Sequence, residues 1–451
     1  MQTPRFPRRH PPAIPSDAVP TISALILNYN ASFEDLDGCI ASVAASDSEE
    51  LIEILIVENG SPENKDVPQR VADRYEKARV VDLGHNWGFS GGINRGVRAC
   101  QGEWVMILNN DTRIDESAIR HCADVLRKEG PEVMGVAPKL LFLRDPHVID
   151  AIGNAVNEYG AAFNVGIGQL DVGQYDRVER CFGPCFAAAL MRTDAFDLDR
   201  VGPLDESYFM YYEDVDWNWR ANLFGYAFVT APEARVYHVH SGSTRVLPFD
   251  FKYRLVERNL LSTVAKNCEG RRAAGIWKGR FGFHGRNVIR KHFRWPSVQI
   301  MVEAMLRGVD SYEKRRQINR RRVVSDGVVF RFAQGELPHF DPRNYDPERT
   351  LSNLIAMYRR KALVTGDKRW FEVAEIANAV EMTRLRFEPG YITSRLLPLL
   401  EGEPDFVVDF VRQIEQETVV NELAKTDAPE ELAEDPAANV VASTPADQHQ
   451  H

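Results

Sequence analysis

A carboxylate stands directly after a short apolar run, at Asp111. Residues 103–108 are mostly aliphatic or aromatic, which is typical of a buried strand, and the polar residues Asn109, Asn110, Asp111 and Thr112 follow them. Ligands of open α/β sheets bind beyond the carboxyl ends of the strands, so Asp111 could hold a divalent cation at such an edge. A simple polar turn is the alternative, because Asn and Asp are favoured turn residues.

Three more carboxylates, Glu213, Asp214 and Asp216, lie close together in an aromatic-rich stretch. The apolar residues beyond them recur at helical spacing, which puts all three acids in the first turn of a helix. The helix dipole favours acids there, and this structural explanation accounts for one or two of them. Like charges this close, beside aromatic side chains, also raise at least one carboxyl pKa, and a carboxylate with a raised pKa can act as a general base.

Two histidines, His238 and His240, alternate along an apolar run that ends in hydroxyl residues. A strand would point both rings to the same face. Alternating histidines on a strand can be metal ligands or packed edge residues, and the residues alone leave both interpretations open.

These chemical groups need a scaffold, and the hydrophobic pattern from Thr21 to Phe142 predicts one. Buried strands are expected at 22–27, 51–57, 79–83, 103–108 and 133–142, and the segments between them carry apolar residues at helical spacing. Strands that alternate with helices in this way form βαβ units. We therefore expect an α/β fold with a mostly parallel sheet, followed by a mainly helical C-terminal region.

Polar or glycine-rich residues follow four of the expected strands. In a parallel sheet those ends meet at one edge, where together they predict a nucleotide pocket. An acid after the second strand suits a base or ribose. A glycine-rich turn before a helix lets backbone N–H groups approach phosphates, although a tight helix-entry turn explains the glycines nearly as well. The candidate nucleotide-binding residues are Asn28, Asn30, Glu58, Asn59, Asn86, Gly88, Phe89, Gly91, Gly92, Asn94, Asn109 and Asn110.

The glycine spacing disfavours two large classes of nucleotide-binding protein. Residues 88–92 lack the G-x-G-x-x-G pattern directly after the first strand, and the chain has no G-x-x-x-x-G-K-[ST] motif. A dinucleotide oxidoreductase and a P-loop NTPase are therefore not expected. A diphosphate neutralised by a cation on Asp111 fits these residues better.

The composition is that of an ordinary globular protein, with 44% hydrophobic and 27% charged residues among 451. No apolar run approaches the roughly 18–20 residues of a membrane-spanning helix, and the Pro/Arg-rich start does not resemble a signal peptide, so we expect a cytoplasmic protein. The expected parts are a flexible arm (1–20), an α/β domain (21–268), a basic helical region (269–337), a helical accessory domain (348–425) and a disordered acidic tail (426–451).

The basic region has sixteen Lys or Arg residues against four Asp or Glu between Arg271 and Arg331. This pattern suits an interfacial helix at the inner face of an anionic cell membrane, and equally a solvated helical face whose aromatic residues pack on the rest of the protein. Nucleic acid is not expected, because no recognisable motif accompanies the charge. The aromatic residues interleaved with the charges are Trp277, Phe281, Phe283, Phe293 and Trp295.

Taken in order, these motifs resemble family 2 glycosyltransferases, which have a GT-A fold, and within them the rhamnosyltransferase-like branch of bacterial surface polysaccharide synthesis. The resemblance runs from about Ile22 to Asn267. Within this range Tyr253, Arg258 and Asn259 resemble a helix that follows the catalytic domain in this branch. The segments that carry it are Leu27–Asn30, Glu58–Ser61, Asn86–Asn94, Leu108–Thr112, Asp205–Asp216 and His238–Ser243.

The resemblance implies a role for individual residues. Asp111 would be the metal-binding carboxylate of a D-x-D element in which Asn109 replaces the first acid, and His238 would complete a Mg²⁺ or Mn²⁺ site. Asp214, paired with Glu213, would be the catalytic base. The other strand-end residues would bind the donor, with Glu58 near its nucleotide base.

The implied activity is an inverting, metal-dependent transfer of L-rhamnose from dTDP-L-rhamnose to a glycan or polyprenyl-diphosphate-linked acceptor. A UDP-galactofuranose or UDP-hexose donor is the alternative. From other classes, a sugar nucleotidyltransferase would need a Gly-rich basic loop after the first strand, where residues 28–31 have none. A non-catalytic sugar-nucleotide-binding scaffold should have lost Asp111 or Asp214.

Overall fold

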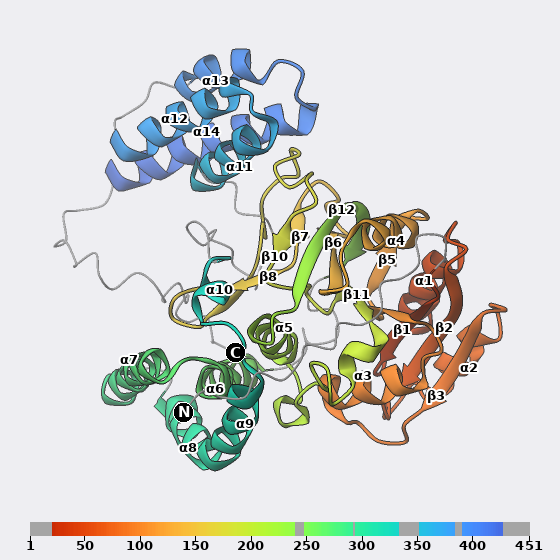
Figure 1. The fold of residues 1–451 in the computed structure, drawn as a ribbon. Coiled ribbons are helices and arrows are strands. Elements are labelled where there is room, and N and C mark those ends of the chain that lie inside the picture. Colours follow the sequence, from red (N-terminus) through yellow and green to blue (C-terminus); the bar gives the residue numbers. More distant parts are fainter. Residues whose placement is uncertain (1–19, 240–247, 292–293, 333–350, 384–389, 427–451) are drawn as a thin grey trace, which may run out of the picture.

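The computed structural model describes residues 20–239, 248–291, 294–332, 351–383 and 390–426 (Figure 1). Several sequence expectations therefore lie outside the described residues. They are almost all of the N-terminal arm, the acidic tail beyond 426, His240 and the hydroxyl residues after it, and Phe293.

A ten-stranded mixed sheet forms the centre of the described structure, in the order β10-β12-β6-β11-β4-β1-β2-β3, with β5 beside β12 and β7 beside β6. Six strands run in one direction: β1 (Ile22–Asn28), β2 (Leu51–Glu58), β3 (Ala78–Asp82), β4 (Trp104–Asn109), β6 (Val133–Phe142) and β12 (Ala227–His238). The opposite direction is taken by β5 (Thr112–Ile114), β7 (Ile149–Ala151), β10 (Arg180–Cys181) and β11 (Ala188–Arg192). The five predicted strands and the α/β class are confirmed.

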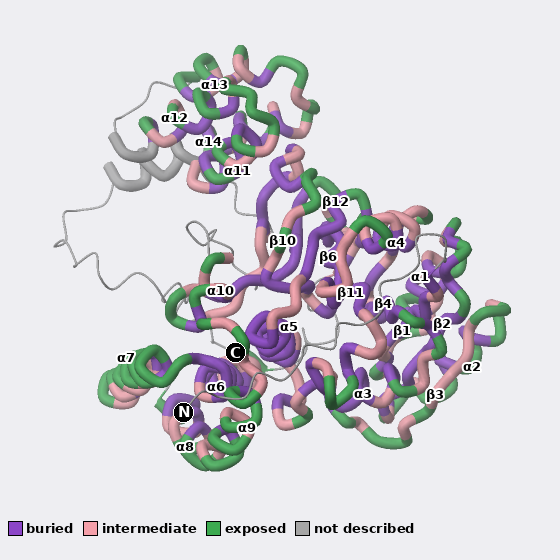
Figure 2. Tube along the Cα trace, viewed as in Figure 1, coloured by how far each residue is buried: buried purple, intermediate pink, exposed green. Residues whose placement is uncertain are grey.

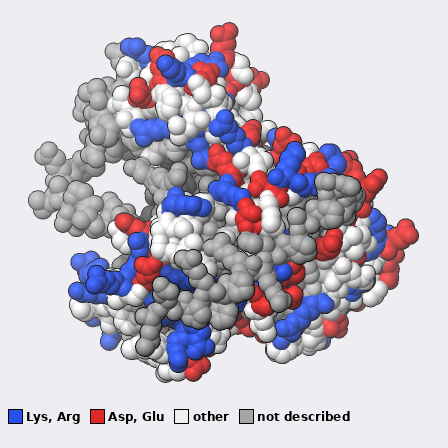
Figure 3. All heavy atoms as spheres, in the orientation of Figure 1, with Lys and Arg blue, Asp and Glu red and all other residues white. Residues whose placement is uncertain are grey.

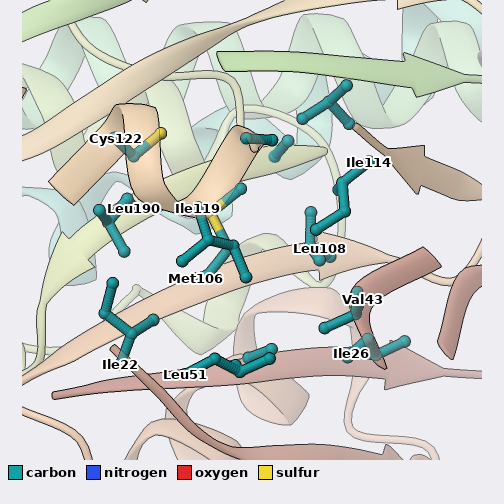
Figure 4. Packing of buried hydrophobic residues seen from close by; sticks show 14 of the residues in the cluster. Ile22, Ile26, Val43, Leu51, Met106, Leu108, Ile114, Ile119, Cys122 and Leu190 are labelled. Carbon is teal, nitrogen blue, oxygen red and sulfur yellow. The ribbon is translucent and has the colours of Figure 1, made fainter. Parts of the chain in front are cut away.

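Helices cover both faces of this sheet because neighbouring strand residues point to opposite sides. Ala24 and Ile26 pack with α1 (Phe33–Ala44), α2 (Val67–Ala72) and α4 (Ala118–Lys128), and Figure 4 shows part of this cluster. Leu25 packs instead with α3 (Gly88–Ala99) and α5 (Glu213–Leu223). The side chain of Ser32 caps α1 by accepting a hydrogen bond from the backbone N–H of Asp35.

The many Gly and Asn residues of segment 148–168 predict irregular structure, but the segment contains three short strands instead. One is β7, which pairs with the end of β6, and the others are β8 (Asn154–Val156) and β9 (Ala162–Asn164), which pair with each other. Gly153 connects β7 to β8 with a φ of +85°, where a side chain would strain the backbone and a Cβ would fall 2.7 Å from the carbonyl oxygen of Gly183.

The C-terminal region is mainly helical, as predicted. Near α5 lie α6 (Phe249–Asn267), α7 (Gly270–Ile289), α8 (Arg294–Leu306), α9 (Gly308–Arg321) and α10 (Gly327–Phe330). A second group contains α11 (Leu351–Thr365), α12 (Lys368–Thr383), α13 (Tyr391–Leu396) and α14 (Asp405–Thr426), which lie at the other end of the molecule in Figure 1. Among the described helices, none has the length and apolar character needed to cross a bilayer.

Candidate active site

The sheet brings Asp111 and His238 together at the carboxyl edge of the parallel strands. Asp111 lies between β4 and β5, and β5 pairs antiparallel with the end of β12, where His238 is the last residue. His238 Nε2 lies 3.4 Å from Asp111 Oδ1, and its Nδ1 lies 2.6 Å from Asp150 Oδ2. The ring therefore lies between two carboxylates, both largely shielded from solvent.

The charges on these carboxylates decide the protonation of His238. Burial by itself would lower the pKa of the imidazole, but Asp111 and Asp150 outweigh burial and raise it to about 10. Where no cation is bound, the ring therefore holds a proton at neutral pH, and a divalent cation that binds Nε2 would have to displace that proton.

The residues fit a small divalent cation. A histidine that hydrogen-bonds a carboxylate through one ring nitrogen and turns the other toward the site is the arrangement that orients metal-binding imidazoles. Mg²⁺ and Mn²⁺ are commonly held by one or two protein groups together with substrate phosphate oxygens. Asp111 and His238 would hold such an ion, with Asp150 behind the ring. The described residues contain no group of three or more candidate ligands, so substrate or water oxygens would have to complete the site.

Asp214 lies in the first turn of α5, where three groups donate hydrogen bonds to it. Asn154 Nδ2 and the backbone N–H of Phe186 donate to Oδ2 at 3.1 and 3.4 Å, and the N–H of Val215 donates to Oδ1 at 2.7 Å. Burial nevertheless raises the pKa of Asp214 above its usual value. Burial and the neighbouring Asp214 also raise the pKa of Glu213, which is only 7% exposed. A carboxylate pair with raised pKa values is suited to accepting a proton.

Asp216, the third acid of this group, points elsewhere. It is fully buried, and its Oδ1 lies 3.0 Å from Lys266 Nζ while its Oδ2 lies 3.1 Å from Arg220 Nε. Asn267 and Tyr208 donate further hydrogen bonds to it. Asp216 is therefore a structural anchor of α5, whereas Glu213 and Asp214 are left together at the helix start.

A strained loop leads into Glu213. Phe209, Tyr211 and Tyr212 all have φ values between 66° and 71°, which side-chain-bearing residues rarely adopt. Asn259 on α6 holds this loop, because its Nδ2 donates to the carbonyl oxygens of Tyr208, Met210 and Tyr211 at 3.2, 2.9 and 2.8 Å. Strain of this kind persists only where surrounding contacts enforce it, so Asn259 is a positioning residue for the start of α5.

Three of the predicted nucleotide-binding residues form one buried network across the strand ends. Asn28 Nδ2 donates to Glu58 Oε2 at 2.6 Å, and Asn110 Nδ2 donates to Asn28 Oδ1 at 3.1 Å. The other carboxylate oxygen of Glu58 accepts from the backbone N–H of Ser61 at 2.5 Å. This network ties β1, β2 and β4 together at the edge, and direct donor contact by these three residues stays a prediction.

The glycine-rich first turn of α3 makes packing contacts, and its approach to a phosphate stays a prediction. The N–H groups of Phe89 and Ser90 donate to the carbonyl oxygen of Phe209 at 2.6 and 3.4 Å, so two amides of the first helical turn are already engaged. Gly88 has a φ of +69°, and a Cβ there would fall 2.5 Å from Phe209. A Cβ at Gly92 would fall 2.5 Å from Leu27, so this glycine lets α3 approach β1.

Four asparagines of the predicted set hold the backbone in place. Asn94 exchanges two hydrogen bonds with the backbone of Leu204, at 2.8 and 2.9 Å. Asn59 accepts from the N–H of Trp87 at 3.0 Å and donates to the carbonyl of Gly88. In the same way the side chains of Asn30 and Asn86 accept backbone N–H groups of nearby turns. Their contact with a nucleotide also stays a prediction.

Sequence reasoning missed Asp150 and Asn154, which connect the two carboxylate groups. Both come from the β7–β8 segment that was expected to be irregular, and the available signal was an acid within the apolar run 148–152. Asp150 contacts His238, and Asn154, a little further along the same segment, contacts Asp214. The β7–β8 segment therefore links the Asp111–His238 pair to Asp214.

Residues 23–142 match the model of glycosyl transferase family 2. This segment belongs to that family. Among curated proteins, the chain is 26% identical over 234 residues to the N-acetylglucosaminyl-diphospho-decaprenol L-rhamnosyltransferase of Mycobacterium tuberculosis. That alignment covers 46% of this chain and 73% of the relative. The chain is 25% identical over 212 residues to the low-salt glycan biosynthesis hexosyltransferase Agl10 of Haloferax volcanii, which covers 44% of this chain and 61% of the relative.

Solved structures give weaker similarities. The mannosyltransferase PcManGT from Pyrobaculum calidifontis, solved with GDP-Man and Mn²⁺, aligns with 68% of this chain and 91% of its own at 13% identity and a TM-score of 0.41.

Proposed function

We propose that this protein is an inverting, metal-dependent glycosyltransferase that moves a sugar from a nucleoside diphosphate to an acceptor hydroxyl. The observation that carries the proposal is the contact of Asp111 with His238 at the edge of the sheet, linked through the β7–β8 segment to Asp214. The family 2 match of the segment that contains β1 to β6 supports the same reaction class.

In the proposed reaction Asp214 acts as the general base. An acceptor hydroxyl gives its proton to the Asp214 carboxylate while its oxygen bonds to the anomeric carbon of the sugar. The bond from that carbon to the diphosphate oxygen breaks on the opposite face, so the configuration inverts. A divalent cation at Asp111 and His238 would offset the negative charge that builds on the departing diphosphate.

Glu213 would tune the base. It lies beside Asp214 and is almost completely buried, so the pair resists losing both protons. Asn154 acts in the opposite sense, because its hydrogen bond favours the ionised form of Asp214. Together they would set how readily Asp214 accepts a proton.

For the donor and acceptor, dTDP-L-rhamnose and a polyprenyl-diphosphate-linked glycan are the proposed substrates. The support is the similarity to a protein named as an N-acetylglucosaminyl-diphospho-decaprenol L-rhamnosyltransferase, at 26% identity.

The proposal is tested by incubating the purified full chain with a panel of dTDP-, UDP- and GDP-sugars and measuring release of the nucleoside diphosphate. Each reaction is run with Mn²⁺, with Mg²⁺ and with a chelator, and thermal shifts report donor binding in parallel. We expect one donor class to bind and turn over only with a divalent cation. Absence of any cation-dependent donor binding across the panel would contradict the proposed function.

A further inference from the structure

A stripe of large apolar side chains lies exposed on α8 and α9. Successive members are three or seven residues apart or adjacent, which places them along one side of this nearly continuous helical pair. Each is between 43% and 76% exposed. The α8–α9 stripe consists of Trp295, Val302, Met305, Leu306, Val309 and Tyr312.

The protein's own core does not account for this stripe. The opposite side of the same helices supplies the buried contacts, at Ile300 and Ala304 of α8 and Ile318 of α9. Figure 2 shows exposed residues on α7, α8 and α9, whereas α5 is buried along its length. A contiguous exposed apolar surface of this kind marks an interaction site.

Of the aromatic residues interleaved with the basic ones, Trp295 belongs to this surface, whereas Trp277 and Phe281 do not. Trp277 and Phe281 of α7 stack on each other with ring centroids 5.3 Å apart and pack against the buried cluster around α6. Trp277 Nε1 donates to the carbonyl oxygen of Leu261 at 3.1 Å. For these two residues the packing explanation is correct.

The charge around the stripe identifies its partner. Five exposed basic residues flank it, against two exposed acids, Asp310 and Glu313. Figure 3 shows Lys and Arg side chains gathered at the lower left, in the area of α7 to α9. Apolar side chains flanked by cationic ones suit the boundary between acyl chains and anionic headgroups. The five basic residues are Arg290, Lys291, Arg294, Arg316 and Arg320.

We propose that the α8–α9 stripe docks the protein on an anionic lipid bilayer. Ile289, at the end of α7 and 81% exposed, extends the apolar surface toward Arg290 and Lys291. Docking requires only the exposed stripe and its charges, so it is independent of the transfer reaction.

The stripe is attached directly to the loop that precedes the proposed base. Arg307, between α8 and α9, donates to the carbonyl oxygen of Ser207 at 2.8 Å, and Lys314 of α9 lies 2.8 Å from Asp205. Residues 205–212 then lead into Glu213 and Asp214. If the proposed function holds, this attachment would bring lipid-linked acceptors close to Asp214. This statement rests on the proposed function, whereas docking on a bilayer does not.

Flotation of the full chain with lipid vesicles tests the docking surface. Vesicles of phosphatidylcholine containing phosphatidylglycerol are compared with pure phosphatidylcholine, at low and high salt. We expect binding to anionic vesicles that falls as salt rises. The variant Trp295→Ser/Leu306→Ser/Val309→Ser should bind at least ~10-fold more weakly, since each buried apolar side chain contributes strongly to partitioning. The variant Arg294→Glu/Arg316→Glu should bind anionic vesicles more weakly, and its binding to pure phosphatidylcholine vesicles should not change.

Leu363→Ser is the matched control, because Leu363 is 69% exposed on α11, outside the stripe. It should bind vesicles like the unaltered chain. Equal vesicle binding by the triple stripe variant would overturn the proposal. Light scattering without vesicles provides a second test. A dimeric unaltered chain and a monomeric triple variant would also overturn the proposal, because that result assigns the stripe to contact with a second copy. Donor-dependent thermal shifts of the same variants report the transferase separately.

Discussion

At the scale of residues, the candidate site contains two groups of carboxylates with different surroundings. Asp111 shares His238 with Asp150, and Asp214 shares a buried position with Glu213. The first group places an imidazole and a carboxylate side by side, which suits holding a divalent cation against an anion. In the second group, burial raises the pKa values of both carboxyls, which suits proton transfer.

Replacing Asp214 by Asn should remove the base while keeping its size and most of its contacts. We expect kcat to fall by about 10²–10⁴-fold, the usual contribution of a positioned general base, with little change in donor affinity. Transfer rates and calorimetric titration of the donor measure the two effects. Unchanged turnover in Asp214→Asn would remove this residue from the mechanism.

The pH dependence of transfer should report the same group. A base must be ionised to act, so the rate is lost as pH falls through the raised pKa of Asp214. Asn154→Ala removes a hydrogen bond to the ionised form, so the acid limb of kcat should move to higher pH. Glu213→Gln replaces a carboxyl that keeps its proton while Asp214 ionises, so this variant should leave the acid limb nearly in place. A shift of the limb to lower pH in Asn154→Ala would contradict this assignment.

The proposed cation site predicts a different pattern for Asp111 and Asp150. Asp111→Ala should abolish the cation dependence of donor binding by removing a ligand. Asp150→Asn, behind the ring of His238, should weaken cation affinity by ~10–100-fold without removing a ligand. Mn²⁺ titrations of donor binding measure both. Donor binding that stays cation-dependent in Asp111→Ala would exclude this aspartate as the ligand.

At the scale of elements, α6 determines the shape of the loop before α5. Asn259 is fully buried, and one amide group satisfies three backbone carbonyls in a loop with three residues at positive φ. The loop also reaches α3, because the carbonyl of Phe209 accepts the first amides of that helix. One strained segment thus connects α3, α5 and α6 around the site.

Asn259→Ala should therefore impair more than local stability. Unsatisfied buried carbonyls should cost about 1–3 kcal/mol in the free energy of unfolding, and the relaxed loop should lower kcat more than donor affinity. Denaturant unfolding and transfer kinetics separate the two effects. Ser262→Ala is the control, since its hydroxyl bonds only the carbonyl of Arg258 one turn earlier on α6. A stability loss with unchanged kcat would limit Asn259 to a structural role.

At the scale of the whole molecule, the two helical groups have different relations to the sheet. The group α6 to α10 packs with α5 and the loop before the site. The group α11 to α14 has its own hydrophobic cluster, which takes in Phe142 at the end of β6 and three residues after it, Val148, Leu170 and Val172. We propose that this second group is an accessory unit, close to the expected boundaries 348–425.

The sequence by itself determined the five strands expected between residues 22 and 142, the α/β class and the position of Asp111 after β4. These features follow from local patterns, because an unbroken apolar run predicts a buried strand. The family resemblance also follows from short motifs in order, and the match over residues 23–142 agrees with it.

Only the tertiary structure decided which polar groups meet. The pairing of β7 with β6 brings Asp150 to His238, and the turn at Gly153 brings Asn154 to Asp214, although this segment has no local strand signal. Asp216 is drawn away by Lys266, more than forty residues later in the chain. Such contacts depend on side chains distant in sequence, whose approach is set by packing and pairing that no local pattern encodes.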